Sequence, residues 1–177
     1  MFGDDADIGL DPNVIVGQDG RVNKILVDNK CFIVKCFIHS VQTLVGRAMK
    51  VWVMFADGKP DTLYILKDSW IQESHVDSEV LFLKDIKKAA LSGRVPELIC
   101  GGDITIKNYS DKTGRYRVDL AGYPYSQRVH HRIVTSTIGE PLTMFQSKKE
   151  FLNILISLLE SKSRYAYSNI RDSNIKM

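Results

Sequence analysis

Residues 50–67 read Lys-Val-Trp-Val-Met-Phe-Ala-Asp-Gly-Lys-Pro-Asp-Thr-Leu-Tyr-Ile-Leu-Lys. Two runs of β-branched and aromatic residues, Lys50–Ala56 and Thr62–Lys67, flank the turn sequence Asp57–Pro60. A strand, an Asp-Gly turn and a second strand form the pattern of a β-hairpin. The stretch therefore predicts an antiparallel hairpin, with Lys67 at the end of its second strand.

A second hairpin is predicted upstream of this one. The strand-like runs Val22–Val27 and Cys31–Ile38 flank a polar three-residue turn, Asp28–Lys30. The residues before this hairpin are acidic, with aspartate at positions 4, 5, 7 and 11, and they lack the basic end and apolar run of a secretory signal. We therefore expect an intracellular protein, either cytoplasmic or nuclear, whose three cysteines are small buried side chains.

Downstream of Trp70 the spacing of the apolar residues changes from every second position, which is typical of a strand, to every third or fourth position, which is typical of a helix. Asp77 and Gly93 are the expected N-cap and C-terminal end of a helix that has an apolar stripe at Val80, Leu83, Ile86 and Ala90. Short strands are predicted after it, at Pro96–Cys100, Ile104–Ile106, Tyr116–Leu120 and His130–Ser136. Turns are expected between them, at Gly101–Asp103 and Asp111–Gly114. This order predicts an α+β fold in which a helix flanks an antiparallel sheet.

The last predicted element is a helix that begins with a capping box. Ser147 can accept a hydrogen bond from the amide of Glu150, whose carboxylate can reach back to the start of the helix. The helix is expected to end near Lys162, and its apolar stripe consists of Phe151, Leu155, Leu158 and Leu159. We expect this stripe to dock on the sheet, to self-associate or to fray, and the exposed helix at 147–162 is a candidate surface for a protein partner.

Composition limits the classes of function. The chain has 177 residues, 44% of them hydrophobic, which is enough for one globular unit with its own core. A net charge of +3 without a dense basic stripe argues against a nucleic-acid partner, and no apolar run approaches the ~20 residues of a membrane span. Because His130 and His131 are adjacent on a predicted strand, they should face opposite ways, and no metal site is expected.

One lysine is a candidate for phosphate chemistry. Lys67 follows a glycine turn by two strands, and an acidic residue, Glu79, lies early in the next predicted helix. An ammonium that is oriented by a carboxylate can bind polyphosphate oxygens, and a glycine turn allows backbone amides to approach them. The spacing alone is a weak signal, since a lysine near a strand end is most often solvated.

Several segments resemble the fungal-type protein kinase family. They read Leu-Val-Gly-Arg-Ala at 44–48, Tyr-Ile-Leu-Lys-Asp-Ser-Trp at 64–70, His-His-Arg-Ile-Val-Thr at 130–135 and Ile-Gly-Glu-Pro-Leu at 138–142. The opening at 7–14, Asp-Ile-Gly-Leu-Asp-Pro-Asn-Val, also resembles the family's start. The resemblance implies a protein-kinase-like N-lobe, in which an antiparallel sheet carries a flanking C-type helix and is followed by one further helix of an incomplete C-lobe.

The resemblance also implies roles for particular residues. Lys67 would contact the α- and β-phosphates of ATP from the third strand, and Glu79 would be its ion-pair partner, with Glu73 as a rival. The loop over the phosphates would consist of Gly46, Arg47 and Ala48. Val51 or Val53 would cover the adenine, and the hinge would consist of Ile138 and Gly139.

Two departures from the family pattern bear on activity. Gly46 is the only glycine of the phosphate loop, which places larger side chains near the phosphates. The family's catalytic loop, His-Arg-Asp-Ile-Ser-x-x-Asn-Ile, aligns with residues 167–175, where Asn169 takes the place of the catalytic aspartate and Asn174 that of the magnesium asparagine. Alignment on Asp172 instead retains the aspartate but displaces Asn174. No Asp-Phe-Gly or Ala-Pro-Glu motif follows before Met177.

These observations predict three segments and two alternative functions. Residues 1–43 hold the acidic segment and leading strands, 44–146 the kinase-like N-lobe to the hinge, and 147–177 the first C-lobe helix and a remnant of the catalytic loop. The favoured hypothesis is an ATP-binding lobe that is catalytically inactive or is a fragment of a longer Ser/Thr-type kinase, with Mg²⁺ bound only if the missing lobe is supplied. The alternative is a pseudokinase-like interaction module that does not bind nucleotide.

Overall fold

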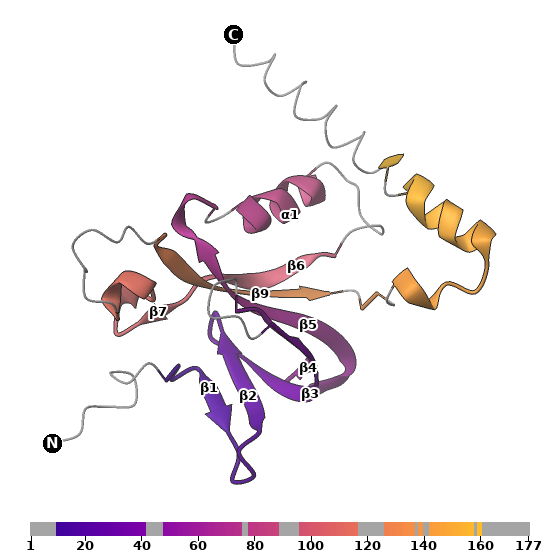
Figure 1. Cartoon of the computed structure of the whole chain (residues 1–177). Coiled ribbons are helices and arrows are strands. Elements are labelled where there is room, and N and C mark those ends of the chain that lie inside the picture. Colours follow the sequence, from indigo (N-terminus) through magenta and orange to yellow (C-terminus); the bar gives the residue numbers. More distant parts are fainter. Residues whose placement is uncertain are drawn as a thin grey trace, which may run out of the picture.

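An antiparallel sheet of seven strands dominates the computed structural model, which describes residues 10–41, 48–75, 78–88, 96–116, 126–136, 138–139, 142–157 and 159–160. The strand order is β1-β2-β3-β4-β5-β9-β6, and a separate two-stranded ribbon pairs β7 with β8. The strands are β1 (Val14–Val16), β2 (Val22–Val27), β3 (Lys30–Ser40), β4 (Lys50–Ala56), β5 (Lys59–Gln72), β6 (Leu98–Asp103), β7 (Thr105–Ile106), β8 (Tyr109–Ser110) and β9 (Arg128–Ser136). Figure 1 shows the sheet curling at its β1–β2 end.

The helical elements lie between and after the strands. Helix α1 (Ser78–Lys88) follows β5, and residues 148–157 form a helix near the end of the described chain. Single turns of 3₁₀ helix are η2 (Glu73–His75), η3 (Thr113–Arg115) and η4 (Leu142–Met144). The α+β fold class is therefore confirmed, and the sheet with its flanking helix is consistent with a kinase-like N-lobe. Among the described residues no helix is both long and apolar enough to cross a membrane.

The central hairpin is confirmed, but its second strand is longer than predicted. Strand β4 pairs antiparallel with β5, and Ala56 lies opposite Lys59, so the turn consists of Asp57 and Gly58 alone. Strand β5 continues to Gln72 because β9 pairs with it along its far half, up to Gln72 opposite Arg128. Lys67 therefore lies within a strand that has neighbours on both sides, and the expectation that it ends the strand was wrong.

The upstream hairpin also has a shorter turn than predicted. Val27 pairs with Lys30, so only Asp28 and Asn29 form the connection. Both have positive φ angles, 48° and 61°, as a two-residue type I′ turn requires. Aspartate and asparagine tolerate this left-handed region better than other residues with side chains do.

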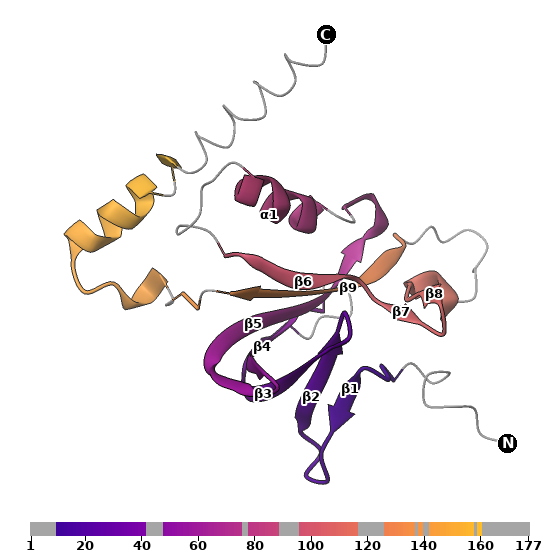
Figure 2. The same ribbon diagram turned by 180° about the vertical axis from the view of Figure 1, so that it is seen from behind.

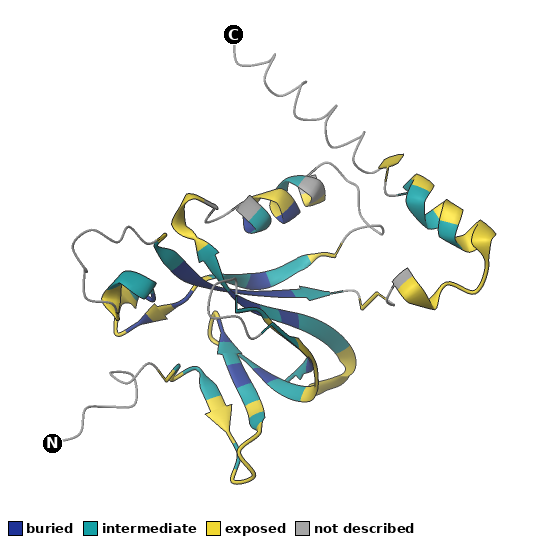
Figure 3. Cartoon of the chain, in the orientation of Figure 1, coloured by how far each residue is buried: buried dark blue, intermediate teal, exposed yellow. Residues whose placement is uncertain are grey.

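Two hydrophobic clusters lie on opposite faces of the sheet. The main core is formed by buried side chains of Ile25, Val27, Phe32, Trp52, Met54, Leu66, Cys100 and Val134, where the leading strands curl over the central ones. On the other face Val80 and Leu83 of α1 pack on Ile133 of β9. Figures 2 and 3 show α1 on one side of β6 and β9, the β1–β2 hairpin on the other, and the buried residues between them. Of the cysteines, Cys100 is buried as expected, whereas Cys36 is exposed.

The predicted turn at Gly101–Asp103 is instead part of β6. Gly101 lies opposite Ile133 and Gly102 opposite Arg132, next to a register shift between Leu98 and Cys100. Gly101 has a φ of 119°, and a Cβ at this position would lie 2.2 Å from the carbonyl oxygen of Arg132. The glycine therefore permits close approach of two strands at an irregular point of the ladder.

The C-terminal helix begins close to the predicted cap and stands apart from the sheet (Figure 1). The Glu150 amide donates to Ser147 Oγ at 3.1 Å, as the capping box predicts, whereas the Glu150 carboxylate accepts from the Gln146 amide at 2.6 Å and not from Ser147. The Phe151 ring packs on Phe145, with 5.0 Å between centroids. The predicted cap Asp77, the helix end Gly93, most of the strand at 116–120 and residues 161–177 lie outside the described residues.

The two adjacent glycines of β6 provide a matched test of this packing. Gly101→Ala should lower the free energy of unfolding by at least about 2 kcal/mol, because the methyl group combines a strained φ with a backbone clash. Gly102→Ala should cost less than about 1 kcal/mol, since nothing lies within 4 Å of its Cβ position. Urea denaturation of both variants measures the difference, and equal costs would contradict the assigned close approach.

Candidate functional site

Lys67 and Glu79 form an ion pair between the central strand β5 and helix α1. Lys67 Nζ donates to Glu79 Oε1 at 2.9 Å and to Oε2 at 2.6 Å. Glu79 lies in the first turn of α1, which Val80 and Leu83 hold against the sheet. The side chains are 25% and 40% exposed, so the pair is fixed in orientation yet accessible from one side.

Glu73, the rival partner, lies elsewhere. Its carboxylate pairs with Lys112, in the segment that follows β8. Glu73 begins the turn η2 directly after Gln72, where the end of β5 lies beside Arg128 at the start of β9. Glu73 therefore lies beyond the far end of β5, paired with Lys112, and the structure pairs Lys67 with Glu79.

The strand register shows which side chains share the face of Lys67. Residues directly opposite one another in an antiparallel ladder point to the same face. Val51 and Ile133 lie opposite Lys67, while Val53 and Thr135 lie opposite Ile65, two positions earlier on the strand. Val53 and Thr135 are thus in the same row, next to the end of β9, and Val53 rather than Val51 lies toward residues 138–139.

The remaining sequence-predicted residues are placed only in part. Residues 138–139 follow β9 and are exposed, with Ile138 42% accessible. Ala48 lies just before β4 with a φ of 40°, and the Val41 amide donates to the Met49 carbonyl at 2.8 Å, closing the base of the segment between β3 and β4. Gly46 and Arg47 lie outside the described residues, as do Asn169, Asp172 and Asn174.

The opposite face of the same strands carries a buried ionic network. Asp68 of β5 lies opposite Arg132 of β9, whose Nε donates to Asp68 Oδ2 at 2.8 Å. Arg132 Nη2 contacts Asp68 as well and donates to Asp11 at 2.5 Å. His130 connects Asp68, at 2.6 Å from Nε2, with Asp111, at 2.8 Å from Nδ1.

Aromatic and hydroxyl groups complete the network. The Trp70 ring stacks on the His130 imidazole with 4.7 Å between centroids and 9° between planes, and Tyr116 Oη donates to Asp111 at 2.8 Å. The Arg132 side chain is only 1% exposed and that of His130 8%. Two buried cations thus share three carboxylates, so each cation has a carboxylate partner.

The network shifts the pKa values of His130 and Asp68. Burial alone would lower the pKa of His130, but its hydrogen bonds to Asp111 and Asp68 outweigh burial and raise the pKa to about 9. Burial would raise the pKa of Asp68, yet the hydrogen bond with His130 and the charge of Arg132 hold it below its usual value. At neutral pH the imidazole is therefore a cation between two anions.

The spacing of three of these residues is also that of metal ligands. Ligand atoms of Asp11, Asp68 and His130 lie within 4.8 Å of one another. The Arg132 guanidinium, however, contacts both aspartates and supplies the positive charge that a metal ion would bring. The donor set is therefore better described as an ion-pair network than as a cation site.

Sequence reasoning did not find this network, although two signals were present. Alternation along β5 places Asp68 and Trp70 on the face opposite Lys67. Alternation along β9 likewise separates His130 from His131, whose Nδ1 lies 2.9 Å from Asp103, and the prediction that the two histidines face opposite ways is confirmed. The convergence of Asp11 and Asp111 on these strands is a tertiary contact without a local sequence signal.

The stability of the chain should fall at alkaline pH. His130 has a pKa of about 9 when folded, against 6.5 for the free side chain, so its stabilising charge is fully present below pH 6.5 and lost as pH rises through 9. The difference between the two pKa values corresponds to a contribution of roughly 3 kcal/mol to the free energy of unfolding. Urea denaturation between pH 6 and 10 should show this loss, and His130→Gln should flatten the profile, whereas exposed His39→Gln should not. An unchanged profile in His130→Gln would contradict the assignment.

Comparison with known proteins is consistent with this arrangement. The family model described as "Fungal protein kinase" matches residues 1–123 of the 177, which extends from the acidic N-terminus through β8 and η3. Neither the curated proteins nor the solved structures yielded a match. Since more than half of the chain matches the family model, and the matched part holds strands β1 to β8, α1 and the Lys67–Glu79 ion pair, the chain belongs to the fungal protein kinase family.

Proposed function

We propose that the chain is an ATP-binding lobe and that Lys67 binds the nucleotide phosphates. The observation that carries this proposal is the ion pair between Lys67 and Glu79, which joins a central strand to the one described helix that packs on the sheet. An ammonium group has three donor hydrogens. The two carboxylate oxygens of Glu79 orient the side chain and leave capacity for a phosphate oxygen on the accessible side.

The rest of the proposed site follows from the register around Lys67. The α- and β-phosphates would lie at the ammonium, and Gly46, Arg47 and Ala48 would cover them. The adenine would lie against Val53, in the row of Ile65 and Thr135, because this row is nearest to the end of β9. Backbone groups of Ile138 and Gly139 would then read the edge of the base, as the resemblance to the family implies.

We further propose that this chain alone does not transfer phosphate. Phosphoryl transfer by a kinase uses an aspartate that accepts the proton of the substrate hydroxyl and an asparagine that holds Mg²⁺. In the gapless alignment the first position is Asn169, whose neutral amide cannot accept that proton, and the second is Asn174.

A second candidate function is an interaction module that does not bind nucleotide. The observation that favours it is the helix at 148–157 with its continuation, where Leu152, Ile156 and Leu159 are each more than half exposed. Three large apolar side chains on one helix that stands apart from the sheet are typical of a surface that a protein partner covers. In this reading the kinase-like lobe serves as a folded support.

Thermal melting with nucleotide separates the two functions. ATP at a concentration of about 100 times its Kd should stabilise the chain by about 2.7 kcal/mol and raise Tm by several degrees. Lys67→Met should abolish the shift, and Glu79→Gln should weaken binding less, since its amide oxygen still accepts from Lys67. The matched control is Lys87→Met, which removes the lysine of an exposed ion pair with Glu97 and should leave the shift intact.

Two results would contradict the proposal. No shift at millimolar ATP, in a chain that melts cooperatively, would exclude nucleotide binding and favour the interaction module. Transfer of labelled phosphate from ATP to a generic protein substrate, above the level of Lys67→Met, would contradict the claim that this chain is inactive by itself.

A further inference from the structure

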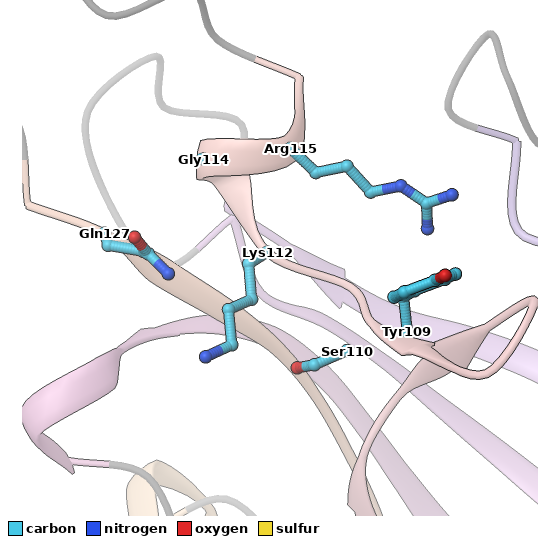
Figure 4. A pocket seen from close by; sticks show the side chains of 6 residues that line it. All are labelled: Tyr109, Ser110, Lys112, Gly114, Arg115 and Gln127. Carbon is cyan, nitrogen blue, oxygen red and sulfur yellow. The ribbon is translucent and has the colours of Figure 1, made fainter.

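A pocket of about 550 Å³ lies beyond the end of β5, away from Lys67. The ribbon β7–β8, the turn η3 and the residues before β9 form its walls (Figure 4). It is lined by Tyr109, Ser110, Lys112, Gly114, Arg115 and Gln127. Most of these side chains are polar or cationic, and none is a carboxylate.

The walls of the pocket are fixed to the sheet. The Arg128 amide donates to Thr113 Oγ1 at 3.0 Å, and the His130 amide donates to the Asp111 carbonyl at 2.8 Å. Lys112 forms a β-bridge with Val129. Because Asp111 also belongs to the buried ionic network, the segment that carries Lys112 and Arg115 is positioned by the core of the lobe.

Arg115 brings a positive charge that forms no salt bridge with the residues that the structure describes. Its Nη1 donates to the Ile106 carbonyl at 3.3 Å, and its guanidinium carbon lies 5.6 Å from the centre of the Tyr109 ring. Within the described part of the chain no carboxylate pairs with it. The neighbouring Asp111 is already bonded to His130 and Tyr116. Among the described residues, the guanidinium therefore uses one of its five N–H donors, in the bond to Ile106.

Lys112 adds a cation whose salt-bridge partner can be replaced, and Ser110 adds a hydroxyl group without a hydrogen-bond partner among the described residues. Lys112 pairs with Glu73, a carboxylate that is 48% exposed and can return to water. Ser110 Oγ is buried and has no hydrogen-bond partner among the described residues. Figure 4 shows the ends of Lys112, Ser110 and Gln127 directed toward one another, so an acceptor placed between them would meet all three donors.

We propose that this pocket binds a phosphate monoester. A phosphate group has the charge to replace Glu73 at Lys112 and acceptor oxygens for Ser110 and Gln127 as well. Arg115 extends over Tyr109, away from these three side chains (Figure 4), and adds its positive charge on the side of the organic part of the ester. The exposed Tyr109 ring, 68% accessible, would contact the organic part of the ester. The same chemistry could be supplied by a free phosphate compound or by a phosphorylated serine of a peptide, and this site is separate from the proposed nucleotide site at Lys67.

Calorimetric titration of the full chain tests the proposal. The probes are inorganic phosphate, a phosphoserine peptide and the same peptide without phosphate. Lys112→Gln and Ser110→Ala should each weaken phosphate binding, Lys112→Gln by about tenfold, and Lys112→Arg should retain part of it. Lys67→Met should leave it unchanged. The matched control is Arg21→Gln, because the Arg21 side chain is 85% exposed at the far hairpin.

Each outcome has a defined meaning. Equal binding of inorganic phosphate and phosphopeptide supports the site with a small phosphate as its ligand, and tighter binding of the phosphopeptide supports a peptide ligand. Absence of saturable binding to both would overturn the proposal, and so would an equal loss in Arg21→Gln, which would indicate non-specific attraction. Loss of phosphate binding in Lys67→Met would overturn it too, because the phosphate would then occupy the nucleotide site. Thermal melting of each variant confirms that it is folded.

Discussion

The Arg132 guanidinium lies between the carboxylates of Asp11 and Asp68, and this buried contact connects parts of the chain that are up to 121 residues apart. A charge in this position is tolerated only when it is paired, and removal of one partner from such a pair costs about 3–5 kcal/mol. The contact therefore restricts how β5 and β9 can align. Since neighbouring residues on a strand face opposite ways, fixing Asp68 on one face also fixes Lys67 on the other.

This coupling divides the family-like segments into two groups. Asp68 and Trp70, from the Lys-Asp-Ser-Trp segment, and His130 and Arg132, from the strand at 130–135, meet in the buried network with Asp11 of the acidic start. Lys67 alone of these residues points to the face of α1. The side chains of these segments thus serve mostly to hold the sheet together, and one of the segments, the strand at 130–135, lies beyond the residues 1–123 that match the family model. The network also extends to Asp111 and so to the phosphate pocket that we propose beside Lys112 and Arg115.

The sequence was sufficient where local patterns determine structure. Alternation and an Asp-Gly turn predicted the β4–β5 hairpin, helical spacing predicted α1, and Ser147 was placed at a helix start. The sequence was insufficient where pairing with a strand far away in the chain determines the local structure. The length of β5 depends on its pairing with β9. The local composition of Gly101–Gly102 predicts a turn, whereas the structure shows that Gly101 is needed for close packing in β6, since a Cβ there would lie 2.2 Å from the Arg132 carbonyl oxygen. The choice of Glu79 over Glu73 likewise required the position of Lys112.

The central claim is that the charged imidazole of His130 is held between the carboxylates of Asp68 and Asp111, on the face of β5 and β9 opposite Lys67. It is tested most directly by NMR titration of the His130 ring, with the ring signals assigned by comparison with His130→Gln. The structure predicts that the imidazole remains protonated through neutral pH and titrates with a pKa of about 9. A midpoint at or below the ordinary value of about 6.5 would mean that the network does not hold this charge and would contradict the account.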